Sequence, residues 1–288
     1  MPSVSSPTVK RRRLAAELRH YRDAAGLTIE EVADQLEWSS AKISRIENAR
    51  VSVLPRDVKF LLAAYGLTDQ DEPWEIMLTL ARESRNKGWW HQYGDAVPDW
   101  FEVFVGLEAE AASVSNYDSE FVPGLLQTEE YARVVHRTSL FTASEEEIEK
   151  RVKVRMARQE LLTSGDGGPE VWFVLNEAAV RRVVGGKATM REQLQRLTEA
   201  MELASVTLQV LPFESGAHPS MDGSFSILGF PEVSDPNVVY IEYQTGALYL
   251  EKPEEVRRYR LMFDHLRAAA LPVDTSRALI ARIADELA

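Results

Sequence analysis

The chain has 288 residues, of which 45% are hydrophobic and 27% are charged, and its formal net charge at pH 7 is −12. These proportions indicate an ordinary globular protein and exclude an intrinsically disordered one. The absence of cysteine excludes disulfides, cysteine-rich zinc sites and thiol catalysis, and no apolar stretch is long enough to span a membrane. We therefore expect a cytoplasmic protein with two domains or one large domain.

The charge is unevenly distributed along the chain. Residues 1–66 contain 11 lysines and arginines against 8 aspartates and glutamates, a net charge of +3, whereas the remaining residues contain 22 against 37. A basic segment on an acidic body is expected if only the first part of the chain meets phosphate groups. A difference of this size also arises by chance, so it is weak evidence alone.

Five helices are predicted in the first 85 residues, after a flexible arm at residues 1–9. Apolar residues at helical spacing favour helices over residues 11–25, 56–65 and about 71–85. Between the first two of these, Thr28 and Glu31 form a capping-box pattern that begins a short helix. Ser39 or Ser40 then caps the next one, whose polar residues face outward.

The segment LTIEEVADQLEWSSAKISRIENAR therefore contains two short helices joined by a tight turn. It resembles the helix-turn-helix of the Cro/phage-repressor (XRE) family, and the resemblance covers about residues 10–66. Ile29 stands where many members have a glutamine, and Glu37 and Ala49 stand where glycines are usual. Asn48 tolerates left-handed geometry and is predicted to end the second helix instead. The resemblance implies a DNA-binding domain at residues 10–85.

In such a domain the second helix of the motif enters the major groove of double-stranded DNA. Arg45 can bind both N7 and O6 of a guanine. The residues predicted to read bases are Ser40, Ala41, Lys42, Ser44 and Arg45. Those predicted to contact the DNA backbone, which positions the protein without reading sequence, are Thr28, Ser39, Asn48, Arg50, Arg11, Arg12 and Arg13. A solvated polar helix face, or a helix-turn-helix used for protein contact, is the alternative.

Residues 86–288 are predicted to form an α+β domain with a mixed or antiparallel sheet. Val206, Leu208 and Val210 alternate with polar residues, which predicts a half-exposed strand. Helices are expected after the cap Thr128 and at residues 144–162, 177–184, 190–203, 254–270 and 276–287, and strands at residues 171–175, 206–210, 224–230, 238–243 and 247–251.

The blocks WWHQY, LEAEA and VPGLLQTEEYARVV resemble those of a carboxy-terminal domain of unknown function, which follows XRE-type domains in many actinobacterial regulators. The resemblance continues through RVKVRMARQELL, VTLQVLPFESGAH and GSFSILGF to about Pro272. It implies a transcription regulator and suggests a small partner protein, but it brings no known ligand.

No catalytic or metal-ligating constellation is evident, so we predict no enzyme activity, no cofactor and no metal. Glu108 and Glu110, two positions apart, face different sides of a helix, and the five histidines are scattered. A small-molecule effector could bind in a pocket lined by Trp89, Trp90, Tyr93, Trp100, Tyr117, Arg155, Arg158 and Gln159. The alternative is that these aromatic residues pack the two domains together. The loop Phe213–Ser224 is a second candidate for the edge of a site.

The leading hypothesis is a cytoplasmic, nucleoid-associated transcription regulator. It would bind a near-palindromic operator as a homodimer, with the dimer contact in the acidic body. One alternative is an interaction module in which the acidic body binds a small protein. A less favoured alternative is an enzyme that is targeted to DNA.

Overall fold

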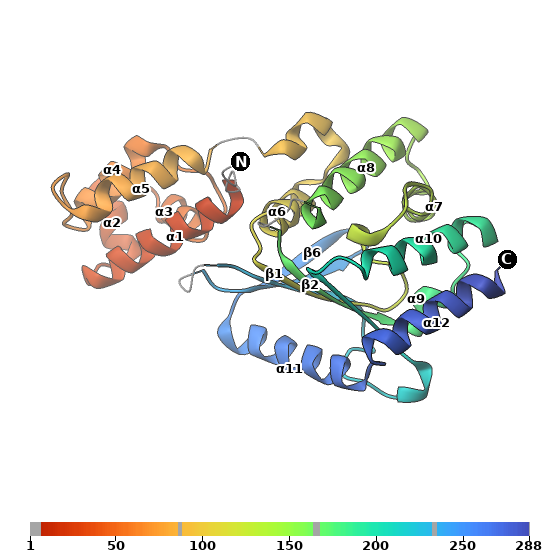
Figure 1. The fold of residues 1–288 in the computed structure, drawn as a ribbon. Helices are drawn as coiled ribbons and strands as arrows, with labels where there is room; N and C mark the ends of the chain where they lie inside the picture. The colour runs from red at the N-terminus through yellow and green to blue at the C-terminus, as the bar shows by residue number, and fades with distance from the viewer. Residues whose placement is uncertain (1–6, 86–87, 164–167, 232–234, 288) are drawn as a thin grey trace. The chain divides into compact units, whose positions relative to one another are not determined.

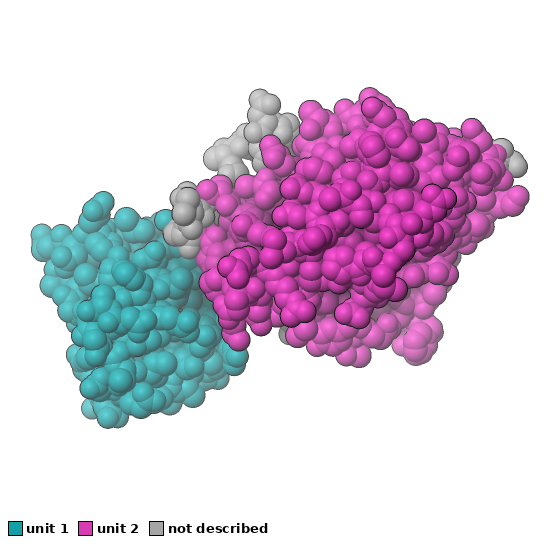
Figure 2. Space-filling view, turned by 90° about the horizontal axis from the view of Figure 1, so that it is seen from below, with its two compact units in different colours: residues 1–91 teal, residues 92–288 magenta. Residues whose placement is uncertain are grey.

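The fold is described from a computed structural model of the chain, which covers residues 7–85, 88–163, 168–231 and 235–287. The chain divides into two compact units, residues 1–91 and residues 92–288 (Figure 2). This division falls a few residues after the predicted domain boundary at residue 85. Helix α1 begins at Pro7, so the last part of the predicted arm is helical, and residues 1–6 lie outside the described residues.

The described residues of the amino-terminal unit form five helices, as predicted (Figure 1). Thr28 and Glu31 make the predicted capping box, because the Thr28 side chain accepts from the backbone N–H of Glu31 and the Glu31 carboxylate accepts from that of Thr28. Pro55 occupies the first turn of the fourth helix. The helices are α1 (Pro7–Ala24), α2 (Ile29–Leu36), α3 (Ser40–Glu47), α4 (Pro55–Ala64) and α5 (Glu72–Glu83).

The five helices bury one apolar core. α2 and α3 have eight residues each, which is too short for a helix to persist in water without packing. Each fully buried aliphatic side chain contributes about 1.5–3 kcal/mol, so the shared core stabilises both short helices. Its central members, none more than 1% exposed, are Leu14, Leu18, Val32, Ile43, Val58, Leu61, Leu62, Met77 and Leu78.

Two residues of this unit other than glycine hold the left-handed backbone conformation. Glu37 ends α2 with a φ of 55°, at the position where the family pattern has glycine. Ala49, which follows α3, also has a φ of 55°. Asn48 has a φ of −102°, so the prediction that it supplies the left-handed stop is wrong. The chain turns one residue later because Asn48 still closes the helix, its N–H reaching the Ser44 carbonyl.

The carboxy-terminal unit contains a mixed sheet, which confirms the predicted α+β class. Within the described residues six strands follow the order β3-β2-β1-β4-β5-β6. β1, β2 and β3 are parallel, and β4, β5 and β6 continue the sheet in antiparallel pairs. The strands are β1 (Ser113–Asp118), β2 (Glu170–Asn176), β3 (Val206–Leu211), β4 (Phe225–Gly229), β5 (Val238–Tyr243) and β6 (Gly246–Leu250).

Helices cover both faces of this sheet (Figure 1). α11 (Pro253–Ala269) lies on one face, where it contacts β1, β3, β4 and β5. The other face carries α6 (Asp99–Glu108), α7 (Glu129–Ser139), α8 (Glu145–Arg158) and α10 (Lys187–Ala200). α9 (Glu177–Arg181) follows β2, and α12 (Val273–Glu286) packs on α10 and the edge strand β3. Short 3-10 segments are η1 (Trp89–Ala96), η2 (Gly124–Leu126), η3 (Gln159–Leu162) and η4 (Phe213–Ser215).

The structure departs from the predictions at two strands. The central strand β1 was not predicted, because its sequence SVSNYD is too polar to indicate a buried strand. The prediction of a half-exposed strand at β3 is wrong, since its residues from Leu208 to Leu211 are all buried. The polar Gln209 is accommodated because it accepts from Trp172 Nε1 at 2.9 Å and donates to the carbonyl of Leu271 at 2.9 Å. No helix in the described part of the chain is long and apolar enough to cross a membrane.

Candidate nucleic-acid interface and candidate pocket

Helix α3 presents the side chains that were predicted to read bases. Ala41 and Arg45 are exposed, and Ser40, Lys42 and Ser44 are half-buried. Ser39 precedes the helix and caps it, its hydroxyl accepting from the backbone N–H of Lys42 at 3.2 Å. The apolar positions Ile43 and Ile46 turn into the core, so the remaining face is left to the polar residues.

Lys42 is held by neighbouring side chains of its own unit. Its Nζ lies 3.1 Å from a carboxylate oxygen of Asp57 and 3.3 Å from the centre of the Trp38 ring. The side chains of Lys42 and Asp57 are partly exposed, so the ion pair contributes on the order of 1 kcal/mol, and the cation–π contact contributes a similar amount. Lys42 must therefore give up these small contributions before it can reach a base.

Arg45 is the more available of the two cations. Its Nε donates to the Ala41 carbonyl of the preceding turn at 3.2 Å, which lays the side chain along the helix. In the part of the chain that the structure describes, no carboxylate lies within 4.0 Å of its guanidinium. Both terminal nitrogens can therefore donate together to N7 and O6 of a guanine.

The residues predicted to contact the DNA backbone differ in how far the fold already uses them. Thr28 is engaged in its capping box, and the Asn48 amide donates to the Ser44 carbonyl at 2.7 Å and accepts from Arg19 at 2.9 Å. Arg50 is exposed just beyond α3. Half-buried positions in the first turns of α1 hold Arg11, Arg12 and Arg13.

A buried ion pair that the sequence analysis missed joins α1 to α3. Arg22 Nε lies 2.8 Å from one Glu47 oxygen, and its Nη2 lies 2.9 Å from the other. The Tyr65 hydroxyl also donates to Glu47, at 3.2 Å, and burial beside this carboxylate raises the pKa of Tyr65. The cluster ties α3 to α1 and α4 at its carboxyl end. Sequence gives little sign of it, because both charged residues fall where a helix surface is equally plausible.

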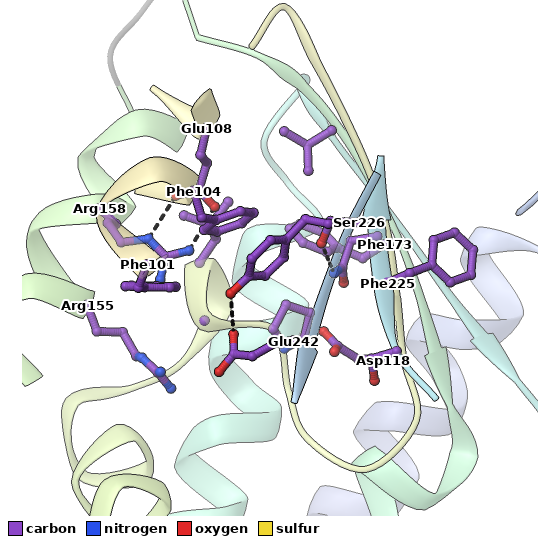
Figure 3. Close-up of a pocket in the computed structure, with 17 residues that line it drawn as sticks. Phe101, Phe104, Glu108, Asp118, Arg155, Arg158, Phe173, Phe225, Ser226 and Glu242 are labelled. Atoms are coloured by element: carbon purple, nitrogen blue, oxygen red, sulfur yellow. Dashed lines mark hydrogen bonds and ion pairs between the residues drawn. The ribbon is translucent and has the colours of Figure 1, made fainter. Parts of the chain in front are cut away.

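A cavity of about 140 Å³ lies in the carboxy-terminal unit, between the sheet and the helices α6 and α8 (Figure 3). Alternate residues of β1 line it, because successive side chains of a strand point to opposite faces. β4 and β5 complete the sheet side. The lining residues are Phe101, Phe104, Glu108, Val114, Asn116, Asp118, Pro123, Gly124, Leu125, Arg155, Arg158, Phe173, Ser224, Phe225, Ser226, Tyr240 and Glu242.

Two pairs of polar residues in this cavity satisfy each other's hydrogen bonds. Arg158 makes a bidentate ion pair with Glu108, with both N···O distances at 2.8 Å, and both side chains are buried. The Tyr240 hydroxyl donates to Glu242 at 2.8 Å, and the Tyr240 ring stacks on Phe104 at 4.1 Å between centroids. These contacts shape the aromatic side of the cavity and neutralise Arg158.

The charged groups of Arg155 and Asp118 have no oppositely charged partner within ion-pair distance in the described residues. Arg155 donates to the Gln127 amide oxygen at 2.7 Å, and burial together with the nearby Arg158 lowers the pKa of Arg155 to about 10. Burial raises the pKa of Asp118 to about 7, against the opposing effect of hydrogen bonds from Ser224 and Asn116. Shifts of this size usually accompany a functional site or a structural charge network. Figure 3 shows the two groups on the helix side and the strand side of the cavity.

The residues predicted for the effector pocket are only partly brought together. Arg155 and Arg158 line the cavity. Gln159 supports its edge, donating to the carbonyls of Gly124 at 3.1 Å and Gln127 at 2.7 Å. Tyr117 points to the opposite face of β1, where it is buried and contacts His218. The aromatic residues outside the lining are Trp89, Trp90, Tyr93 and Trp100.

Sequence reasoning missed most of the strand-side residues of the cavity. Asn116 and Asp118 belong to the unpredicted strand β1, and Glu242 lies in a strand considered only for its apolar residues. The alternation of Val114, Asn116 and Asp118 was the available signal, since it places all three on one face. The candidate loop Phe213–Ser224 contributes its last residue, Ser224.

Two family models match the chain. Residues 13–74 match a helix-turn-helix domain, and residues 101–282 match a domain of unknown function, DUF5753. No curated protein and no solved structure matches the chain. These matches confirm both parts of the resemblance stated from the sequence motifs. Because the second match covers more than half of the chain, the protein belongs to the DUF5753 family, with a helix-turn-helix domain preceding the domain that defines it.

Proposed function

We propose that the protein is a sequence-specific transcription regulator of the Cro/phage-repressor type, whose helix α3 reads the major groove. A helix-turn-helix domain is typical of DNA-binding regulators. The observation that carries the proposal is Arg45, which is exposed on the outward face of α3 and has no carboxylate within 4.0 Å among the described residues. The Lys42–Asp57 contact supports Arg45 as the principal reader, since Lys42 must first leave its partner.

We further propose that the protein acts as a dimer in the cytoplasm, bound to the nucleoid, and that the carboxy-terminal unit holds the dimer together. Two copies of α3 would then reach successive major-groove faces about 34 Å apart. The carboxy-terminal unit would also sense an effector. Its cavity, with a half-buried arginine and a half-buried carboxyl group, favours a small molecule over the small partner protein that the family resemblance suggests. We propose that the protein has no enzymatic activity.

The test is a pair of substitutions on and beside α3. Genomic selection with the purified protein first identifies its preferred DNA. In competition shift assays, Arg45→Ala should lose about 1–3 kcal/mol of preference for that sequence while keeping weak, salt-sensitive binding to any DNA. Arg50→Ala should weaken binding to all sequences alike and reduce the slope of log K against log salt by about 0.9, because it removes one phosphate contact.

The two variants control for each other, since both remove an exposed arginine from the same region. Unchanged sequence preference in Arg45→Ala would refute the assignment of Arg45 as a base reader. No sequence preference in the wild-type protein would refute the proposed function itself.

A further inference from the structure

We propose that the cavity of the carboxy-terminal unit binds a small monocarboxylic acid that carries a hydrogen-bond donor, with the carboxylate on Arg155 and the donor on Asn116 (Figure 3). The inference rests on the proposed sensing role of this unit and names the chemical class of the effector. The cavity contains a cation, an acceptor and an apolar wall that the fold leaves available, each of which is a separate observation.

The cation is Arg155. Of the two arginines in the cavity, Arg158 is neutralised by Glu108, whereas among the described residues Arg155 has the neutral Gln127 amide as its hydrogen-bond partner. No carboxylate of the described residues lies within 4.0 Å of Arg155. Burial and the neighbouring Arg158 disfavour the charged guanidinium and lower its pKa, and the more distant carboxyl groups of Glu242 and Asp118 offset this only in part. A carboxylate can accept two parallel hydrogen bonds from the guanidinium fork and would supply the missing charge.

The acceptor is the amide oxygen of Asn116. The Asn116 nitrogen donates to the Ser226 hydroxyl at 2.9 Å, whereas its Oδ1 is buried with no hydrogen-bond partner in the described structure. Buried polar atoms are almost always paired, so an orphaned acceptor that lines a cavity indicates a missing donor. A hydroxyl or amino group on the ligand would supply it.

The body of the ligand would lie against an aromatic wall. Phe104 and Tyr240 stack on each other, and Phe101 stacks on Phe104 at 5.6 Å between centroids. All three line the cavity. Their stacked faces cover one another, and the ring surface that remains toward the cavity is apolar. A ring or a short hydrocarbon therefore fits this wall better than a fully polar chain.

The volume of the cavity and the charges that line it narrow the class of ligand further. One water molecule needs about 10–15 Å³ of such a cavity, so a volume of about 140 Å³ has room for roughly ten non-hydrogen atoms. Glu108 is paired with Arg158, but Asp118 and Glu242 line the same cavity without an arginine partner within 4.0 Å in the described residues. The carboxyl groups of Asp118 and Glu242 would repel a second negative charge, which favours a monocarboxylate over a phosphate.

The experiment is isothermal titration calorimetry on the full-length protein with 2-, 3- and 4-hydroxybenzoate, benzoate, 4-hydroxybenzamide and inorganic phosphate. At least one hydroxybenzoate should bind about tenfold more tightly than benzoate, which lacks the donor, and than the neutral amide. The assignment is overturned if no hydroxybenzoate binds, if the amide binds as tightly as the best acid, or if phosphate binds more tightly than every acid.

Substitutions on α8 locate the bound acid. Arg155→Gln should weaken the best acid at least tenfold, and Arg155→Lys, which keeps the charge but loses the fork, should weaken it less. Arg151→Gln is the matched control: it lies one turn earlier, pairs with Glu147 and does not line the cavity. Its affinity for the acid should equal that of the wild type, and circular dichroism checks folding. Equal affinities for Arg155→Gln and Arg151→Gln would overturn the placement at Arg155.

DNA binding separates this inference from the proposed function. If the best acid binds and shifts the affinity for the selected DNA in a fluorescence anisotropy assay, the result supports both the ligand assignment and the proposed sensing role. Acid binding at Arg155 without a shift would support the ligand assignment and refute the proposed sensing role. Specific DNA binding with no response of the cavity to any acid would refute the ligand assignment and leave the DNA-binding role intact.

Discussion

Ala49 adopts a backbone conformation that favours glycine. Its φ of 55° lies in the left-handed region, which costs an L-residue roughly 1–2 kcal/mol because Cβ approaches the following carbonyl oxygen. The strain persists because the chain must turn directly after α3, and the Ala49 N–H still reaches the Ile46 carbonyl at 3.0 Å. Glu37 carries the same strain between α2 and α3.

Ala49→Gly is therefore expected to stabilise the amino-terminal unit by about 0.5–1 kcal/mol, after the entropy that glycine costs is subtracted. Thermal unfolding of the full chain, followed by circular dichroism, measures the effect. The control is Ala16→Gly in the exposed middle of α1, which should destabilise the unit by about 1 kcal/mol. A loss of stability in Ala49→Gly as large as in Ala16→Gly would contradict the assigned backbone strain.

His136 makes the carboxy-terminal unit sensitive to acid. Burial, together with Arg155, Arg151 and Arg158, lowers the pKa of His136 to about 3, and its Nε2 is buried without a described hydrogen-bond partner. The imidazole stays neutral in the folded state, whereas in the unfolded state it takes up a proton below about pH 6.5. Its contribution to stability is therefore present above pH 6.5 and is lost progressively as pH falls toward 3.

From pH 7.5 to pH 5, the wild type should lose about 2 kcal/mol of unfolding free energy through this residue, a loss that His136→Leu should not show. Urea unfolding at the two pH values measures the difference. The raised pKa of Asp118 acts in the opposite direction over this range, but it is present in both proteins and cancels in the comparison. His265→Gln, on an exposed position of α11, serves as the control. If His136→Leu retained the pH dependence of the wild type, burial of a neutral imidazole would be refuted.

At the scale of elements, α3 has an inner face that anchors it in the fold and an outer face that is proposed to contact DNA. Its carboxyl end is held by Glu47, which bonds Arg22 of α1 and Tyr65 after α4, while its outward face carries Arg45. Breaking a buried ion pair leaves an uncompensated charge, which costs more than the pair itself contributes. The position and stability of α3 therefore depend on residues that do not lie on the face proposed to contact DNA.

Glu47→Ala should accordingly destabilise the amino-terminal unit by about 3–5 kcal/mol, because Arg22 remains buried without its partner. The double variant Arg22→Met/Glu47→Leu should lose less than Glu47→Ala alone, since no charge is left unpaired. Arg45→Ala, from the exposed face of the same helix, should change stability by less than about 0.5 kcal/mol. The single variants Arg22→Met and Glu47→Leu complete a cycle with the double variant and the wild type. Denaturant unfolding of these four proteins gives the coupling energy, and additive losses would exclude the buried pair as a stabilising unit.

At the scale of the whole molecule, the net charge is divided unevenly between the two units, and each unit has its own core. Residues 1–91 hold 14 lysines and arginines against 13 aspartates and glutamates, whereas residues 92–288, which include the mixed sheet, hold 19 against 32. In the proposed complex, the basic residues of the first unit would attract DNA, whereas the negative charge of the second unit would discourage non-specific binding through that unit.

The proposed arrangement gives an expected difference between the full chain and residues 1–91. Sedimentation should give the full chain a mass of twice its 32.5 kDa, and footprinting should show two protected half-sites about 34 Å apart. The shorter fragment should be monomeric and bind the same DNA at least tenfold more weakly, because it loses the linked second half-site. Equal affinities of fragment and full chain would refute a dimer held by the carboxy-terminal unit.

Local chemistry made much of this fold predictable from sequence. The helix caps follow from the sequence pattern, because a cap depends only on residues within three or four positions. The capping residues are Thr28, Ser39, Thr128 and Ser144. The apolar periodicity that defines the five amino-terminal helices is equally local. For the same reason the outward face of α3, and with it the candidate base-reading residues, followed from the sequence alone.

The candidate pocket depended instead on contacts between distant parts of the chain. β1 is a central strand because β2 and β4 pair with it, which overrides the weak strand propensity of SVSNYD and brings Asn116 and Asp118 to the cavity. Arg155 meets those residues only after β1 and α8 pack on opposite sides of one cavity. The sequence thus determined the helices, their caps and the reading face, because hydrogen bonds and apolar spacing act over a few residues. Only the tertiary structure decided which charged residues are buried together, because burial depends on neighbours that are remote along the chain.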